Sequence, residues 1–118
     1  MTVQWLDAPE DHDYGAAAQY LSLLDNPYNG CIDAFIKSLR SAPESQYYAK
    51  DILRASQLSL LPTDNAHVAK DLNKIHHGKP LSPVLLIRGR PLIIADGYHR
   101  VCASYHVDEN SPVSCRIV

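Results

Sequence analysis

Long apolar runs are missing from this sequence of 118 residues, because none approaches the ~18 residues that a membrane-spanning helix requires. Residues 1–7 also lack the basic start and the long apolar stretch of a secretory signal peptide. We therefore expect a cytoplasmic protein without a membrane partner. Hydrophobic residues make up 46% of the chain and charged residues 20%, which is typical of an ordinary folded domain.

Cysteine is scarce as well. Cys31, Cys102 and Cys115 are odd in number and contain no C-x-x-C pair, which argues against both a disulfide framework and a zinc ribbon. Cys102 and His106 do have the i, i+4 spacing at which one helix can present two zinc ligands. Packing is the simpler interpretation, because Cys102 falls on an apolar stripe and free cysteines are often buried. We expect reduced thiols in a core.

A strong excess of basic charge is absent too. The formal net charge is -2, and residues 1–49 hold two basic and seven acidic side chains, whereas residues 50–118 hold nine basic and six acidic ones. The acidic first half argues against binding along a DNA backbone, while the mildly basic second half suits a small anionic ligand. We expect no DNA binding by this chain alone.

Apolar residues in the first half recur with helical spacing. Positions i, i+3, i+4 and i+7 are apolar in two stretches, which are Ala17, Tyr20, Leu21 and Leu24, and Ile32, Phe35, Ile36 and Leu39. Residues 25–30 between them have turn chemistry. The cluster of Asp11, His12 and Asp13 is interpreted as a solvated boundary before the first helix.

Two further helices are expected in the middle of the chain. Residues 50–56 predict a short helix with Asp51 as its cap. A clearer helix follows, whose start can be capped by Thr63 or Asp64 and whose end is marked by Gly78. Apolar side chains at helical spacing give this helix a core face, namely Val68, Leu72 and Ile75.

Strands are expected near the end of the chain. Residues 83–87 and 92–95 are apolar runs joined by Arg-Gly-Arg-Pro, so a hairpin is the economical interpretation. A helix follows directly, and residues 112–118 are predicted to return as a last strand. The predicted fold class is α+β, a small mixed sheet with helices, preceded by a helical N-terminal layer. We expect a single domain, in which residues 1–49 are a helical cap and residues 50–118 are the core.

The strongest candidate for a functional site lies where the second hairpin strand runs into the last helix. Gly97 allows a sharp turn there, which leaves the first N–H groups of the helix free for an anion that the helix dipole also favours. His99 and Arg100 then lie in the first helical turn, where they can clamp a phosphate. Asp96 is a candidate for holding a magnesium ion or for accepting the proton of a substrate hydroxyl.

Each of these residues also has a simpler interpretation. Asp96 can be the N-cap of the helix, His99 a surface imidazole and Arg100 half of a salt bridge. For Asp96 taken alone, the cap is the better interpretation. A D-G-x-H-R string is short enough to arise by chance, so the pattern by itself does not establish a site.

The order of motifs over residues 60–118 resembles the ParB/sulfiredoxin superfamily. Members of this superfamily have a polar segment that leads into a helix, then a Pro-Val entry to a hairpin, then a G-x-x-R helix start. The corresponding segments here are Asp-Asn-Ala-His-Val at residues 64–68, Gly-Lys-Pro-Leu-Ser-Pro-Val-Leu-Leu at residues 78–86, and Leu-Ile-Ile-Ala-Asp-Gly-Tyr-His-Arg-Val-Cys-Ala at residues 92–103. Residues 1–49 have no recognised counterpart.

This resemblance implies a nucleotide ligand, such as ATP, ADP or CTP with Mg2+, whose phosphates are held at the helix start. The residues that it implies as ligand contacts are Gly97, Tyr98, His99 and Arg100, together with His67 and Lys70 from the preceding helix. The closest string is D-G-H-H-R of the ParB-like free-serine kinases, from which this sequence differs at Tyr98. The acidic base of those kinases corresponds by position to Asp64.

Departures from the family pattern narrow the expected function. Tyr98 stands where sulfiredoxins have their nucleophilic cysteine, so sulfinic acid repair is not expected. Partition ParB proteins continue into DNA-binding domains that this sequence does not contain, so a DNA clamp is not expected either. Two functions are left open: a nucleotide-dependent phosphotransferase or hydrolase acting on a small hydroxyl substrate, and a non-catalytic nucleotide-responsive module recognised by a partner protein. A nuclease ranks third, because a basic stripe is missing.

Overall fold

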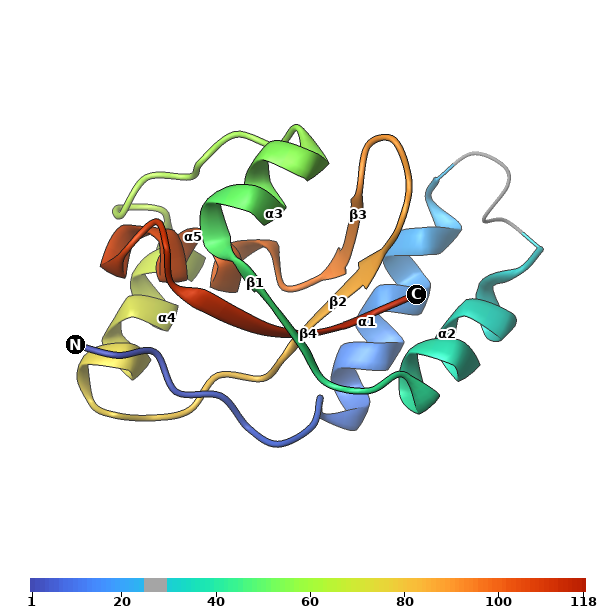
Figure 1. The fold of residues 1–118 in the computed structure, drawn as a ribbon, viewed down its shortest axis with the longest axis horizontal. Coiled ribbons are helices and arrows are strands. Elements are labelled where there is room, and N and C mark those ends of the chain that lie inside the picture. Colours follow the sequence, from blue (N-terminus) through green and yellow to red (C-terminus); the bar gives the residue numbers. More distant parts are fainter. Residues whose placement is uncertain (25–29) are drawn as a thin grey trace.

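The computed structural model describes residues 1–24 and 30–118, so the predicted turn at residues 25–30 lies, apart from Gly30, outside the described residues. The elements in chain order are α1 (Asp11–Ser22), α2 (Ile32–Ser41), β1 (Ser45–Tyr48), α3 (Ala49–Ser56), α4 (Ala66–His76), β2 (Val84–Ile87), β3 (Ile93–Asp96), α5 (Tyr98–Val107) and β4 (Pro112–Ile117). Within the described residues they form the predicted α+β fold, with five helices and a four-stranded mixed sheet (Figure 1). None of these helices is long and apolar enough to cross a membrane.

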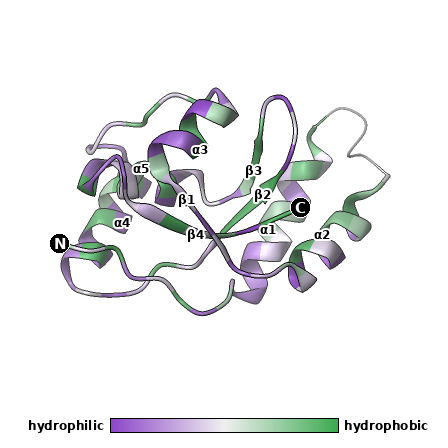
Figure 2. Ribbon diagram, in the orientation of Figure 1, coloured by the Kyte–Doolittle hydropathy of each residue, from purple (hydrophilic) through white to green (hydrophobic). Residues whose placement is uncertain are grey.

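The sheet has the strand order β1-β4-β2-β3. The predicted hairpin is confirmed, because β2 and β3 pair antiparallel with Leu86 opposite Ile94. The predicted last strand is confirmed as well, since β4 returns parallel to β2 with Cys115 opposite Val84. β2 is a continuous apolar run that is buried along its whole length, as expected of a strand with neighbours on both sides and helices on both faces (Figure 2).

Residues 45–48 form a strand where the sequence predicts only a helical cap. β1 pairs antiparallel with β4 at one edge of the sheet, with Ser45 opposite Cys115. Because Gln46, Tyr47 and Tyr48 are all exposed, the apolar alternation from which a strand is usually recognised is missing. The chain therefore enters the sheet before residue 50, and the N-terminal segment is not purely helical.

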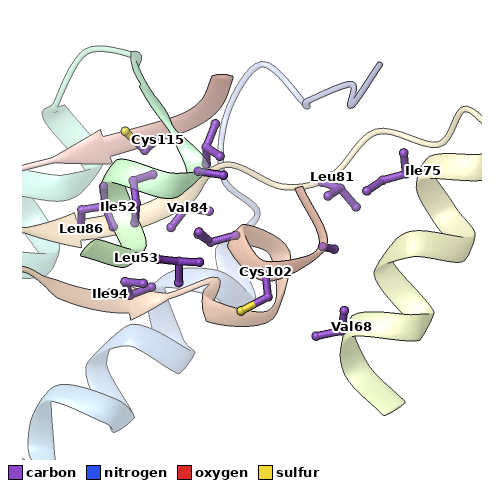
Figure 3. Packing of buried hydrophobic residues seen from close by; sticks show 14 residues of the cluster. Ile52, Leu53, Val68, Ile75, Leu81, Val84, Leu86, Ile94, Cys102 and Cys115 are labelled. Carbon is purple, nitrogen blue, oxygen red and sulfur yellow. The ribbon is translucent and has the colours of Figure 1, made fainter. Parts of the chain in front are cut away.

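The helices cover both faces of the sheet. Successive residues of a strand point to opposite faces, and in β2 Val84 and Leu86 pack with α3, α4 and α5, whereas Leu85 packs with α1 and α2. Figure 3 shows the first of these two cores, in which Cys102 and Cys115 lie among aliphatic side chains. Both thiols are free, as predicted, and burial raises the pKa of Cys115 to about 11.

Two predicted helix caps are wrong and one helix end is confirmed. Asn65, rather than Thr63 or Asp64, caps α4, because its side-chain oxygen accepts hydrogen bonds from two backbone N–H groups of the first turn at 3.0 and 3.2 Å. Asp51 lies within the first turn of α3 and does not precede it. Gly78 follows the end of α4 with a φ of +68°, as its predicted role requires.

Candidate functional site

The turn between β3 and α5 requires glycine. Gly97 has a φ of +110°, a conformation that residues with a Cβ atom rarely adopt. A Cβ atom at this position would lie 2.8 Å from Cγ2 of Val84 and 2.9 Å from Nη2 of Arg100. Gly97 is itself the N-cap of α5, so Asp96 is not the cap and the residue before the helix has no side chain to satisfy its first N–H groups.

Arg100 is held by two carboxylates from different elements. Its Nη2 donates a hydrogen bond to Oδ2 of Asp96 at 3.0 Å, and its Nη1 lies 3.7 Å from Oδ1 of Asp13 in α1. The Arg100 side chain is 17% exposed and the Asp13 side chain only 2%. The salt-bridge interpretation of Arg100 is therefore confirmed, with the pair largely buried. The interpretation of Asp13 as part of a solvated boundary is wrong.

The pKa values of Asp13 and Asp96 are shifted in opposite directions. Burial opposes the ionisation of Asp13, but a hydrogen bond donated by the Ser82 hydroxyl and the charge of Arg100 outweigh it, so the pKa of Asp13 is lowered. Burial raises the pKa of Asp96 against the charge of Arg100, and the neighbouring Asp13 adds to the increase. Two close carboxyl groups thus share one guanidinium group, and Asp13 keeps its negative charge more readily than Asp96.

A pocket of about 200 Å³ opens beside this turn, between α4 and the start of α5. One wall is a polar stripe of α4 at positions i, i+3, i+4 and i+7, namely His67, Lys70, Asp71 and Lys74. The other wall consists of Asp96, Gly97, His99 and Arg100. Cationic side chains from both helices therefore face the space beside the positive end of the α5 dipole.

The titratable side chains of the pocket influence one another. The rings of His67 and His99 have their centroids 4.7 Å apart and are tilted by 45°. Burial and the nearby His67 lower the pKa of His99, although Asp71 acts in the opposite direction. Burial also raises the pKa of Asp71, against the charges of Arg100 and Lys74. The site therefore disfavours the protonated form of His99 and increases the affinity of the Asp71 carboxyl group for a proton.

The structure brings six of the eight predicted site residues together and leaves two apart. Asp96, Gly97, His99, Arg100, His67 and Lys70 line the pocket. Asp64 is exposed in the turn before α4 and is not part of either wall. Tyr98 points elsewhere, because its hydroxyl donates a hydrogen bond to the carbonyl of Ser59 and its side chain lines a second cavity. The roles of these residues in binding or catalysis stay predictions.

Four residues of the site lie outside the predicted set. Asp71 and Lys74 belong to the polar stripe of α4, and their helical spacing from His67 is a local signal that could have identified them. Asp13 and Ser82 reach the turn only through tertiary contacts, for which a single sequence offers no local signal.

The sequence patterns offer two metal sites, magnesium at Asp96 and, as an alternative, zinc at Cys102 and His106. Within residues 1–24 and 30–118, no three His, Cys, Asp or Glu side chains gather in a group that could hold an ion. Asp96, the predicted magnesium ligand, forms an ion pair with Arg100, and its role as a metal ligand stays a prediction. The zinc alternative is not supported, because His106 Nε2 donates to the Leu61 carbonyl at 2.7 Å and Cys102 is packed in the core.

Nothing matched this chain in comparisons with protein-family models, with curated proteins and with solved structures. The likeness to the ParB/sulfiredoxin superfamily therefore rests on sequence motifs alone. The chemistry of the pocket has to be inferred from its own residues.

Proposed function

We propose that this chain is a nucleotide-binding protein of ParB/sulfiredoxin type that holds the phosphates of its ligand in the pocket between α4 and α5. The observation that carries the proposal is the convergence of Lys70, Lys74 and Arg100 on one pocket beside the start of α5. The backbone N–H groups and the dipole at the start of a helix favour the same ligand charge. The family resemblance at the D-G-x-H-R string supports it independently.

The cations of the pocket have different tasks in this proposal. Arg100 is already engaged by Asp13 and Asp96, so much of its charge is compensated within the protein. Lys70 and Lys74 form no ion pair with a carboxylate of the described residues, which leaves their charges for the ligand. We therefore assign the phosphate to the two lysines and to the first N–H groups of α5, and we assign Arg100 to holding the turn in place.

The acidic residues favour a nucleotide-responsive module over a phosphotransferase. Asp64, the predicted base, is exposed away from the pocket, and Asp96 is occupied by Arg100. The ion pair between Arg100 and Asp13 links the pocket to α1. An anion bound by the two lysines lies beside Arg100, so its charge alters this ion pair, and a partner protein can recognise the changed N-terminal layer.

The catalytic alternative depends on Asp71. A nucleotide-dependent phosphotransferase or hydrolase needs a group that accepts a proton from the attacking hydroxyl or water. Asp71 faces the pocket and has a raised pKa, whereas Asp64 does not reach it. The test is an assay of nucleotide turnover with small hydroxyl acceptors. If the wild type turns the nucleotide over, and Asp71→Asn binds the nucleotide but does not turn it over, the protein is an enzyme.

Binding itself is tested by thermal unfolding with ATP, ADP, CTP and GTP, each with and without Mg2+. We expect at least one nucleotide to raise the melting temperature, because a ligand at 100 times its Kd adds about 2.7 kcal/mol to the free energy of unfolding. Lys74→Ala should abolish most of the increase. Lys79→Ala is the matched control, since Lys79 is an exposed lysine beyond the end of α4. No increase with any nucleotide, or equal increases in both variants, would contradict the proposal.

A further inference from the structure

A second cavity adjoins the phosphate pocket at the β3–α5 turn. It has a volume of about 430 Å³ and shares Asp96, Gly97 and His99 with the phosphate pocket. Its remaining walls come from α1, from β3, from α5 and from the connection between α3 and α4, and they consist of Ala16, Tyr20, Leu58, Ile94, Ala95 and Tyr98. A single ligand can therefore extend from one cavity into the other.

The two cavities differ in polarity. Charged and imidazole side chains dominate the phosphate pocket, whereas the walls that the second cavity adds are aliphatic or aromatic. Tyr20 and Leu58 are 40% and 39% exposed, although each is a large hydrophobic side chain. Covering such surface is favourable in proportion to the apolar area removed from water. An apolar part of a ligand would supply this cover next to the anion site.

Tyr98 holds one wall of the second cavity in position. Its hydroxyl donates a hydrogen bond to the carbonyl of Ser59, the residue next to Leu58. This contact ties the connection between α3 and α4 to the first residue of α5. The tyrosine that interrupts the D-G-H-H-R string is therefore a positioning residue, which places Leu58 beside the turn.

We propose that the ligand is a phosphorylated compound with a planar apolar group, of which nucleoside phosphates are the simplest class, and that the planar group lies in the second cavity against Tyr20 and Leu58. This inference rests on the proposed function, because the phosphate pocket anchors the ligand. The ring of Tyr20 offers a stacking surface and Leu58 an apolar contact. The nucleotide is too large for a phosphate pocket of about 200 Å³ alone, which gives the second cavity its role.

Isothermal titration calorimetry with pyrophosphate, ADP, CDP and GDP tests this assignment. The best nucleoside diphosphate should bind at least about tenfold more tightly than pyrophosphate. Tyr20→Ala and Leu58→Ala should each lower the affinity for this nucleotide by about five- to tenfold. Both variants should bind pyrophosphate like the wild type. Two matched controls replace the same type of side chain, at nearly the same exposure, outside this cavity. They are Tyr47→Ala, at 41%, and Leu60→Ala, at 39%.

The outcomes separate this inference from the proposed function. If Tyr20→Ala and Leu58→Ala bind the nucleotide as tightly as the two controls, or lose pyrophosphate binding equally, the second cavity is not the subsite and the inference is overturned. Pyrophosphate binding then still supports the proposed function. If neither pyrophosphate nor any nucleotide binds the wild type, the proposed function fails and the inference fails with it.

Discussion

The helices α1 and α4 both reach the turn at Gly97, but they contribute to it differently. α4 presents a polar stripe whose members recur at helical spacing and face the pocket. α1 presents Asp13, a buried carboxylate that contacts Arg100 from the far end of the sequence. The α4 side, to which the proposed ligand is assigned, can thus be recognised from a local sequence pattern, whereas the α1 side, which holds Arg100, depends on tertiary contacts. Substitutions can test whether these two contributions are separable.

Gly97→Ala should damage both contributions at once and have the largest effect. The new Cβ atom would meet Val84 at 2.8 Å in a backbone conformation that alanine rarely adopts, so we expect the free energy of unfolding to fall by about 2–4 kcal/mol. Urea denaturation measures this loss. The control is Gly15→Ala inside α1, where no atom lies within 4 Å of the added Cβ and a gain of about 0.5–1 kcal/mol is expected. Equal stabilities of the two variants would contradict the described turn.

Asp13→Ala should break the α1 contribution alone. The substitution leaves the Ser82 hydroxyl and part of the Arg100 guanidinium without a partner, so we expect a loss of about 2–3 kcal/mol in urea denaturation at pH 7. Asp11→Ala is the control, because Asp11 is 96% exposed in its ion pair with Arg40 and should contribute about 0.5 kcal/mol or less.

The effect of Asp13→Ala should also depend on pH. Since the pKa of Asp13 is lowered in the folded state, its stabilisation is present above the ordinary aspartate value of about 3.9 and is lost as the pH falls through the lower folded value. The difference between wild type and variant should therefore shrink in strong acid. A difference that stays constant down to pH 2 would show that Asp13 acts without its charge.

The contrast between local and tertiary signals also explains which parts of the fold the sequence predicts. The hairpin of β2 and β3 is predicted because both strands are continuous apolar runs with a turn between them. β1 is not, because an exposed edge strand of Ser, Gln and two Tyr residues lacks apolar alternation, and its pairing with β4 joins distant segments. Asn65 replaces the predicted caps of α4 because neighbouring polar residues are equivalent candidates until the backbone is known.

The candidate site shows the same division. Gly97, His99 and Arg100 are predicted because a strand that enters a helix through glycine is a local pattern. Asp64 lies outside the pocket, whose α4 stripe begins at His67, so the role of base that the family motif gives it by position stays a prediction. The direction of the Tyr98 side chain depends on a hydrogen bond to the α3–α4 connection, which the string D-G-x-H-R does not encode.

Tyr98→Phe should loosen the wall of the second cavity that contains Leu58 and leave the pocket between α4 and α5 unchanged. Removing the hydroxyl deletes the hydrogen bond to Ser59, so we expect a loss of about 0.5–1 kcal/mol and faster amide hydrogen exchange at residues 57–61. The control is Tyr105→Phe in the same helix, which removes an exposed and longer contact with Glu109 at 3.4 Å. Unchanged exchange in Tyr98→Phe would show that the connection is held by other contacts.

His99→Gln should have the smallest effect on stability. It reports on the α4 contribution because the ring of His67 in α4 lies beside the ring of His99. Burial and the neighbouring His67 lower the pKa of His99, so its stabilisation is full above the ordinary histidine value of about 6.5 and is lost as the pH falls through the lower folded value. His99→Gln should therefore reduce the decline in stability between pH 7 and pH 5. The control is His76→Gln, at an exposed position at the end of α4, and equal declines in stability of the two variants would contradict the prediction.

A bound phosphate should reverse this preference of His99 for the neutral form. The negative charge of pyrophosphate beside the imidazole raises its pKa in the complex, so the wild type should gain affinity from pH 7 to pH 5 relative to His99→Gln. Pyrophosphate itself changes protonation between pH 7 and pH 5. The affinity of His99→Gln over the same range therefore serves as the reference from which the contribution of His99 is measured. Identical pH dependence of binding in the two proteins would mean that the anion does not lie beside His99, and the phosphate would then have to be assigned to the lysines of α4 without the first turn of α5.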